Sequence, residues 1–390
     1  MRKCRVCDGT SFRDVLDMGD QPLVNSLVSK VDLERTEPVF PLKVEWCETC
    51  HLVQVVEPID SKKIYRDVDY LYFSGDMPGL SDYFKEYADE VKTHIKPGGF
   101  VVEIGSNDGT MLKHFEGYRR LGVDPSTNVV ARAVAEGIPS LSDFFSSRLA
   151  RSIKREFGAA DLIYANNCIA HIDNIKDVVS GVSQLISDDG VFVIECNYWG
   201  GMVKNLNYSL IYHDHFSYFT LNDWIGLAAG AGLTAYDAVV TPAQGGSLRV
   251  FMSAKKRDAT TRFKNMYLEE RVTGLGKYSS CEVFHDGVVE KAKKLGNKIR
   301  FLKKDGMVVA GYGAAAKGFS ILSLAKITNE IAFFIDDSPA KQGKYTPVNH
   351  IPVIAKDGAP TPDAYIITAP NYAKAIMEKE KGFSGEWIIP

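Results

Sequence analysis

The sequence has no long hydrophobic run and no excess of charge of either sign. No segment approaches the roughly 18 apolar residues that a membrane-spanning helix needs. The charged N-terminal stretch MRKCRVCDGT is not followed by the apolar segment of a signal peptide. The 46 basic and 49 acidic side chains leave a net charge of −3, so neither nucleic acid nor a membrane surface is indicated as a partner. We therefore expect a cytoplasmic protein.

Glycine and proline are not abundant, at 33 and 16 of 390 residues. Together with a hydrophobic fraction of 45%, these counts exclude collagen-like, disordered and low-complexity chains. The chain is too long for a single core, since a domain usually holds about 100–200 residues. We expect two or three globular domains.

The seven cysteines are an odd number, which does not suit a disulfide scaffold in a cytoplasmic chain. Four of them form two C-x-x-C pairs, Cys4 with Cys7 and Cys47 with Cys50. Each pair places two thiolates on one tight turn, and two such turns close a tetrahedral zinc site. Four protein ligands leave no position for water, so the zinc would be structural. A redox role or free thiols are the alternative interpretation.

From about residue 80, strands alternate with helices, which is typical of a parallel α/β sheet. A predicted strand at 99–104 runs into the acidic loop 103–109, and a helix is expected at 110–115. The loop lacks the G-x-G-x-x-G fingerprint of a dinucleotide site, and its carboxylates would repel a pyrophosphate. They suit a cationic ligand that carries a ribose, namely S-adenosylmethionine.

The residues predicted to bind this cofactor lie where four successive strands end. Asp124, at the tip of the second strand (120–123), is placed to hold a ribose diol by two hydrogen bonds. Asp143 and Phe144 combine an acid with an aromatic ring and suit adenine, and Asn166 and Asn167 follow the fourth strand (161–165). The full set is Glu103, Gly105, Asn107, Asp108, Asp124, Asp143, Phe144, Asn166 and Asn167. An α/β domain with ordinary turns is the alternative.

Two histidine clusters are candidates for chemistry. His171 follows the fourth strand, where active sites of open α/β sheets form, and the segment 212–218 reads Tyr-His-Asp-His-Phe-Ser-Tyr. Such a cluster can also be a metal site or a solvated loop. The tyrosines of segment 69–75 are either core residues or hydrogen-bond donors in a cleft, and the glycines of segment 244–249 precede a strand.

Residues 256–300 are charged with helical spacing and predict a helical connector. A second α/β unit follows, in which a strand at 307–310 runs into Gly311–Gly318, a G-x-G-x-x-A pattern. Lys317 in this loop favours a phosphate-bearing ligand, and Asp336 or Asp337 after the next strand is placed to hold a second ribose. A NAD site is the alternative.

Further motifs follow one another in a specific order. They are the two C-x-x-C pairs, Gln-Pro-Leu-Val-Asn at 21–25, Tyr-x-Tyr-x-Ser at 70–74, and the segments 103–109, 165–171, 211–219, 245–249, 311–318 and 335–345. In these motifs and in their order, the chain resembles the sugar C-methyltransferases of deoxysugar biosynthesis. The resemblance implies a zinc-binding domain at 1–75, a class I methyltransferase domain with a Rossmann-like doubly wound sheet at 76–255, the connector at 256–300, and a C-terminal Rossmann-like domain at 301–390. It also suggests a monomer.

The resemblance implies S-adenosylmethionine-dependent methylation of a carbon beside the ketone of a sugar linked to a nucleoside diphosphate. Its catalytic groups map onto Tyr72, His171, Asp214 and His215, with His215 as the base that forms an enolate. Where the family has Glu-His, this chain has Asp214-His215, one methylene shorter, and this departure bears on the orientation of His215. Where the family has His before Gly-Gly-Ser, this chain has Gln244, and this second departure points to a different sugar or ring substituent. The residues predicted to bind substrate are Tyr70, Tyr212, Gln244, Ser247, Arg249, Gly311, Gly313, Lys317 and Asp336.

Three other functions are compatible with parts of the sequence. A sugar O-methyltransferase needs only a base, a non-catalytic nucleotide-sugar-binding protein needs only the two Rossmann-like units, and a NAD-dependent oxidoreductase would use the loop 311–318.

Overall fold

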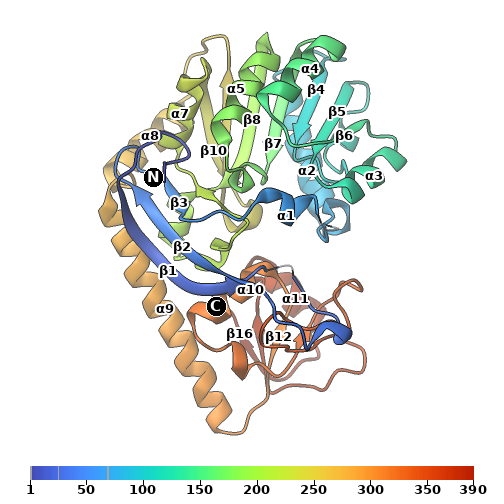
Figure 1. Ribbon diagram of the computed structural model, residues 1–390, viewed down its shortest axis with the longest axis vertical. Helices are drawn as coiled ribbons and strands as arrows, with labels where there is room; N and C mark the ends of the chain where they lie inside the picture. The colour runs from blue at the N-terminus through green and yellow to red at the C-terminus, as the bar shows by residue number, and fades with distance from the viewer. Residues whose placement is uncertain (1, 25, 68–69) are drawn as a thin grey trace.

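Three β-sheets organise the chain, as seen in a computed structural model that describes residues 2–24, 26–67 and 70–390. Figure 1 shows the seven-stranded sheet at the top and the five-stranded C-terminal unit at the bottom, with β1, β2 and α9 running along one side of both. Asn25 of the motif at 21–25 and Asp69 of the segment 69–75 lie outside the described residues.

The N-terminal sheet is antiparallel and has the order β1 (Phe12–Pro22), β2 (Val39–Cys47), β3 (Val53–Val55), β9 (Ser217–Tyr218). Its fourth strand comes from the middle of the chain, where Ser217 and Tyr218 pair with Gln54 and Val53. The histidine cluster at 212–218 is therefore fixed between the N-terminal sheet and the seven-stranded sheet. Helix α1 (Ser61–Tyr65) follows β3 and leads toward the next domain.

The large sheet has the order β10-β11-β8-β7-β4-β5-β6. Its five parallel strands are β4 (Phe100–Ile104), β5 (Arg119–Asp124), β6 (Ser140–Ser142), β7 (Ala160–Asn166) and β8 (Ile186–Asn197). The strand β11 (Ser247–Ser253) is antiparallel to both neighbours, β8 and β10 (Thr234–Thr241). The predicted doubly wound sheet is confirmed, and the strand order reverses between β4 and β7, where such sheets bind ligands.

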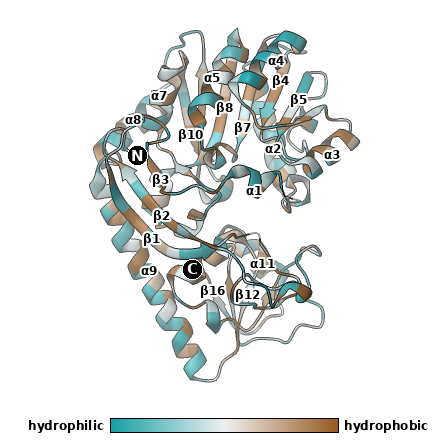
Figure 2. Ribbon diagram, in the orientation of Figure 1, coloured by the Kyte–Doolittle hydropathy of each residue, from teal (hydrophilic) through white to brown (hydrophobic). Residues whose placement is uncertain are grey.

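Helices cover both faces of this sheet, so its central strands are buried and hydrophobic (Figure 2). Three of these helices begin at a side-chain cap: Ser146 for α4 (Ser147–Phe157), Asn174 for α5 (Ile175–Leu185) and Thr220 for α7 (Leu221–Gly230). The remaining helices of this unit are α2 (Leu80–Lys92), α3 (Thr127–Ala135) and α6 (Trp199–Asn205).

The prediction of an α-helix at 110–115 is wrong, because only a 3-10 turn forms there, at Leu112–His114. Gly109 and Gly117 both adopt positive φ angles, which interrupt helical geometry on either side of this segment. Met111, Leu112 and Phe115 instead turn inward and are buried. The loop after β4 is therefore not followed by the N-terminus of an α-helix.

The C-terminal sheet is fully parallel, with the order β14 (Val353–Ile354), β13 (Phe334–Ile335), β12 (Val309–Tyr312), β15 (Ala364–Ile367), β16 (Glu386–Ile388). The helices α10 (Ala316–Leu324) and α11 (Ala373–Lys379) belong to this unit. This arrangement confirms the predicted Rossmann-like C-terminal fold.

Two helices, α8 (Thr261–Thr273) and α9 (Tyr278–Lys304), join the large sheet to the C-terminal unit (Figure 1). The buried residues of α9 share one core with β1, β2 and the C-terminal sheet. Within the described parts of the chain, none of the helices combines the length and apolar character needed to cross a membrane.

Candidate active site

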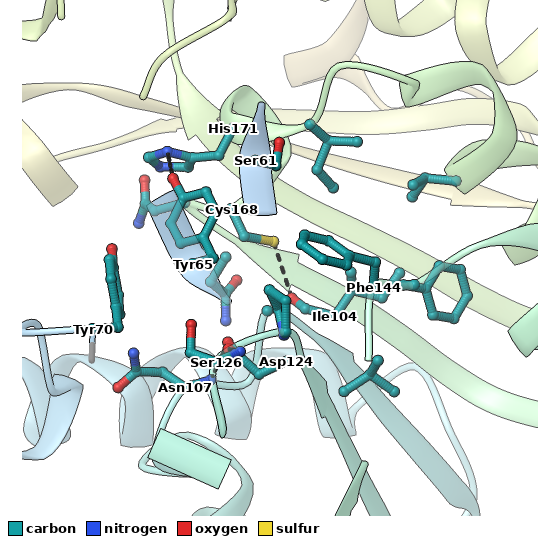
Figure 3. A pocket seen from close by; sticks show the side chains of 18 of the residues that line it. Ser61, Tyr65, Tyr70, Ile104, Asn107, Asp124, Ser126, Phe144, Cys168 and His171 are labelled. Carbon is teal, nitrogen blue, oxygen red and sulfur yellow. Dashed lines mark hydrogen bonds between the residues drawn. The ribbon is translucent and has the colours of Figure 1, made fainter. Parts of the chain in front are cut away.

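A cavity of about 380 Å³ opens at the carboxyl ends of β4, β5 and β7, where the strand order reverses (Figure 3). Segment 70–74 and α1 close it from the side of the N-terminal domain. The predicted site residues that line it are Tyr70, Tyr72, Gly105, Asn107, Asp124, Phe144, Asn166, Asn167, His171 and Gln244. The fold thus brings most predicted cofactor residues and two predicted catalytic residues to one cavity.

The loop after β4 is shaped by two residues with positive φ, Gly105 (+70°) and Asn107 (+49°). Glycine is required at 105, because a Cβ atom there would lie 2.4 Å from Cβ of Cys168. The side chain of Asn107 ties the loop to segment 70–74, since its Oδ1 accepts from the backbone N–H of Ser74 (2.9 Å) and its Nδ2 donates to the carbonyl of Tyr72 (3.0 Å).

Asp124 ends β5 and projects toward the cavity floor (Figure 3). Its two carboxylate oxygens accept from the backbone N–H groups of Asn107 (3.0 Å) and Ser126 (2.9 Å). Burial raises its pKa from the usual value, while these hydrogen bonds oppose the rise. Each oxygen keeps a second lone pair, so the carboxylate can still accept from a diol.

Two predicted cofactor residues support the site rather than line it. Glu103 is buried beneath the loop, accepts from the hydroxyl of Tyr164 (3.1 Å), and has a pKa raised well above its usual range by burial. Asp108 is fully buried and accepts from the backbone N–H of Gly75 (2.9 Å) and the hydroxyl of Thr110 (2.5 Å). It therefore anchors segment 70–75 over the cavity.

Phe144 lines the cavity, whereas the neighbouring Asp143 faces Arg66 at 3.6 Å. Asn166 and Asn167 lie at the opposite wall, and the Oδ1 atom of each is buried with no hydrogen-bond partner among the described residues. Buried acceptors without partners are rare in folded proteins and are expected to meet ligand donors. These two oxygens fit the ammonium group of an amino-acid tail.

His171 belongs to a 3-10 turn (Ile169–His171) directly after β7 and lines the cavity. Its Nδ1 lies 2.7 Å from the hydroxyl of Tyr65 on α1 (Figure 3). Burial lowers its pKa to about 4, so the ring is neutral at physiological pH. Its ring centroid lies 4.8 Å from that of His215, which brings the two histidine clusters together.

Two groups contact Nδ1 of His215, the carbonyl oxygen of Leu210 at 2.6 Å and the amide nitrogen of Asn197 at 3.0 Å. Because a carbonyl only accepts, the shorter contact favours the tautomer in which Nδ1 carries the proton. The lone pair is then on Nε2, which lies 2.9 Å from the hydroxyl of Tyr212. Burial, with the neighbouring His171, lowers the pKa of His215 well below its usual value.

Asp214 is almost completely buried, and no hydrogen bond of its carboxylate is found among the described residues. Burial raises its pKa to about 7. The negative charge of Asp214 in turn adds to the burial that raises the pKa values of Tyr65, Tyr70 and Tyr212. The carboxylate thus faces a group of tyrosines. Burial also raises the pKa of Tyr72, which lines the cavity.

Asp214 makes the stability of the protein depend on pH. The pKa of the folded state is raised above the ordinary value of 3.8, so stability is lost as pH rises from about 4 through 7. Asp214→Asn should therefore be more stable than the wild type by up to about 4 kcal/mol at pH 8 and by up to about 1.5 kcal/mol at pH 5. Urea unfolding at both pH values measures this, with the exposed Asp286→Asn as the control. Equal gains at both pH values would contradict it.

The other predicted substrate residues of the large sheet differ in position. Tyr70 packs edge-on to Tyr65 in the cavity wall, with ring centroids 5.3 Å apart. Ser247 is buried, and its hydroxyl donates to the carbonyl of Ala243 (3.0 Å). Arg249 lies in a buried ion-pair network with Glu195 (2.8 Å) away from the cavity lining, so its visible role is to hold β8, β11 and α2 together.

In the C-terminal unit the loop after β12 repeats the geometry of the loop after β4. Gly313 has a φ of +92°, and Asp336, after β13, accepts from the backbone N–H groups of Ala314 (2.8 Å) and Ser338 (2.9 Å). Gly311 lies against Phe334, where a Cβ atom would come within 2.3 Å of the ring. The ammonium group of Lys317 donates to Oε1 of Gln244 at 2.9 Å.

Many residues of the cavity lining were not predicted from the sequence, and three polar ones illustrate why. Ser61 and Tyr65 come from α1, and Ser126 follows Asp124. Ser126 could have been predicted, since it lies two positions after Asp124, the acidic residue that ends β5. Ser61 and Tyr65 carry no motif, and only the folding of α1 against the sheet brings them to the cavity.

The four cysteines of the C-x-x-C pairs converge at the N-terminal sheet. Their sulfur atoms all lie within 4.8 Å of one another, with Cys4 and Cys50 at 3.5 Å and Cys7 and Cys47 at 3.6 Å. Two of the four are buried. Four thiolates at this spacing fit a tetrahedral structural zinc ion.

Comparisons with known proteins agree along the whole chain. Residues 4–65 match a family of zinc binding domains, residues 80–238 a methyltransferase domain, and residues 242–390 the C-methyltransferase C-terminal domain. The chain is 33% identical to C-methyltransferase NovU of Streptomyces niveus over 400 aligned positions, which span 100% of this chain and 95% of that protein.

Solved methyltransferase structures resemble only part of the chain. One is an S-adenosylmethionine-dependent methyltransferase from Clostridium acetobutylicum (13% identity, TM-score 0.37, 47% of this chain and 94% of that one). Another is magnesium protoporphyrin IX methyltransferase from Synechocystis with bound S-adenosylmethionine (13% identity, TM-score 0.34, 49% and 88%).

Proposed function

We propose that this chain, which belongs to the family of S-adenosylmethionine-dependent C-methyltransferases, methylates a carbon beside the ketone of a deoxysugar linked to a nucleoside diphosphate. One observation carries the proposal. His171 lines the same cavity as Asp124, and His215, whose favoured tautomer has its lone pair on Nε2, lies directly behind it. A carbon acid needs such a base beside the methyl donor, because a C–H group beside a ketone does not ionise unaided.

The cavity fits S-adenosylmethionine, which supplies an electrophilic methyl group on a sulfonium centre. Asp124 accepts the two hydroxyl groups of the ribose, and Phe144 packs against the adenine. The unpartnered oxygens of Asn166 and Asn167 take the ammonium group of the methionine tail. These residues would hold the donor at both ends, and the donor would supply its methyl group in the cavity that His171 also lines.

In the proposed reaction, Nε2 of His215 removes the proton beside the ketone, and the electron pair of the C–H bond forms an enolate. Tyr212, whose hydroxyl faces that lone pair in this structure, moves aside when the sugar enters. Tyr72 and the Tyr65–His171 pair stabilise the enolate oxygen. The enolate carbon then forms a bond to the methyl carbon as the sulfur–methyl bond breaks, which leaves S-adenosylhomocysteine, and the proton on His215 passes to solvent.

Asp214 is a second candidate for the base. It is buried near Tyr65, Tyr70 and Tyr212, its carboxylate has no described hydrogen bond, and its pKa of about 7 is close to that of an efficient general base. If Asp214 is the base, the activity should rise with pH through about 7 and this limb should vanish in Asp214→Asn.

The C-terminal unit is proposed to hold the nucleoside diphosphate. The open turn at Gly313 and the N-terminus of α10 suit a phosphate group, and Asp336 occupies the position that Asp124 has in the large sheet. Titration with NAD(H) and with nucleoside diphosphates tests this assignment, since tight binding of NAD alone would reverse it. We further propose that the protein acts in the cytoplasm as a monomer.

The function is tested by incubating the protein with S-adenosylmethionine and nucleoside-diphosphate keto-deoxysugars. Formation of S-adenosylhomocysteine and a product with a new carbon–methyl bond in NMR spectra is the expected result. A methyl group on oxygen would support an O-methyltransferase instead. Binding of both ligands without any turnover would support the non-catalytic alternative.

Asp124→Ala should weaken the binding of S-adenosylmethionine by at least about tenfold. Each lost hydrogen bond to a charged group costs roughly 1.5–3 kcal/mol before water compensates. The substitution also frees the backbone of Asn107 and Ser126, which Asp124 now holds. Calorimetric titration measures the affinity, with the exposed Asp188→Ala as a control. An unaltered affinity would refute the placement of the ribose.

A further inference from the structure

A contact between two domains reaches the wall of the cavity. Lys317 lies in the first turn of α10, and its ammonium group donates to Oε1 of Gln244 at 2.9 Å and lies 3.5 Å from the carbonyl oxygen of Gln244. Gln244 belongs to the connection between β10 and β11 and lines the cavity together with Tyr70 and His171. A residue of the C-terminal unit therefore sets the orientation of a side chain in the active site.

This contact fixes which atoms Gln244 offers to a ligand. An ammonium group has only donors, so the amide oxygen must face Lys317 and the amide NH₂ must point elsewhere. The backbone of Gln244 is in the left-handed region (φ +53°, ψ +18°) and is followed by Gly245 and Gly246, also at positive φ. Lys317 is what holds the side chain of this irregular loop in one orientation.

One positively charged group, the ammonium of Lys317, lies directly beside Gln244. Lys317 is half-buried, and the loss of solvent around its ammonium group lowers its pKa to about 8, which still leaves it mostly protonated at pH 7. Its charge also reaches His215, whose pKa it lowers in addition to the effects of burial and of His171. A cationic group placed beside Gln244 would thus meet an NH₂ donor and a nearby ammonium charge in a site of low dielectric constant.

We infer that Gln244, oriented by Lys317, is a specificity residue that donates a hydrogen bond to a hydroxyl or carbonyl oxygen of the sugar ring and rejects an amino group at that position. The inference rests on the proposed function and names its substrate class, an oxygen-substituted keto-deoxysugar as opposed to an amino sugar. The discrimination arises because the amino sugar leaves two donors facing each other without an acceptor.

The two residues can be altered without removing the contact between the domains. A second hydrogen bond, from the hydroxyl of Ser320 on α10 to the carbonyl of Ile211 (2.5 Å), joins α10 to the histidine-bearing segment independently. Gln244→Glu keeps an acceptor for Lys317 and replaces the NH₂ donor with a second acceptor. Lys317→Met removes the group that orients the amide, so the amide can turn either way.

The test uses a thymidine-diphosphate keto-deoxyhexose with a hydroxyl beside the reacting carbon and its counterpart with an amino group there. The wild type should favour the hydroxyl sugar in kcat/KM and in calorimetric Kd by at least about tenfold, the factor expected for one unmatched buried hydrogen bond. Gln244→Glu should invert this preference, and Lys317→Met should bring the ratio close to one.

Gln184→Glu is the matched control, because Gln184 lies on α5 and its Oε1 also accepts from a cation, Arg151 at 3.0 Å. It should keep the wild-type ratio. A wild-type preference for the amino sugar, or the same ratio in the wild type and Gln244→Glu, would overturn the inference. Failure of turnover with both sugars refutes the proposed function, whereas the ratio of Kd values still decides the role of Gln244. Binding of neither sugar overturns both.

Discussion

His215→Ala should lower methyl transfer by about 10²–10⁴-fold while S-adenosylmethionine and the nucleotide sugar still bind. A positioned base stabilises the transition state and contributes little to the binding of the ground state, so kcat falls and the dissociation constants change little. The carbonyl of Leu210 directs the lone pair of His215 to Nε2, and no other ring nitrogen among the described residues is held in this way beside the cavity. Single-turnover rates and calorimetric titration measure the two quantities.

Exchange of the sugar proton with solvent deuterium separates His215 from its neighbours. With a non-reactive analogue in the methyl-donor site, the wild type should exchange the proton beside the ketone, and His215→Ala should not. His171→Ala and Tyr72→Phe should slow exchange less, because they hold the enolate rather than take the proton. The exposed His285→Ala on α9 serves as a control. Exchange that persists in His215→Ala but stops in Asp214→Asn would assign the base to Asp214.

The residues at strand ends could be predicted because the rule that brings them together is local. Parallel strands place their carboxyl ends at one edge, so Asp124, Asn166, Asn167 and His171 can be located from their positions after apolar runs. The same rule says nothing about the direction of a side chain. Glu103 was expected at the cofactor but lies beneath the loop with Tyr164.

Contacts between distant parts of the chain could not be predicted from patterns. Strand β9 completes the N-terminal sheet from residues 217–218, and a two-residue strand has no periodicity to recognise. Lys317 was expected to bind phosphate from its place in a glycine-rich loop, yet its side chain meets Gln244, 73 positions earlier in the sequence. Both contacts depend on the packing of α10 and of the N-terminal sheet against the large sheet, which no local signal encodes.

Zinc should be essential to the stability of the N-terminal domain, and Cys47→Ser should lose the metal and lower the melting temperature strongly. Structural zinc sites contribute about 10–16 kcal/mol of apparent free energy in small domains, so the loss of one thiolate is expected to cost several kcal/mol. Cys47 ends β2, and Cys4 and Cys47 pack in one core with Phe219 and Trp224 of the methyltransferase domain. The damage should therefore extend beyond the zinc site.

The matched control is Cys281→Ser, since Cys281 is as buried as Cys4 but lies on α9 away from the other cysteines. Both variants exchange a buried thiol for a hydroxyl, and only Cys47→Ser removes a ligand. Metal analysis of the purified proteins should find about one zinc per chain in the wild type and in Cys281→Ser. Strand β9 pairs with β3 beside the segment that carries Asp214 and His215, so loss of zinc should also weaken methyl transfer. Unchanged zinc content and melting in Cys47→Ser would show that the four cysteines do not form the metal site.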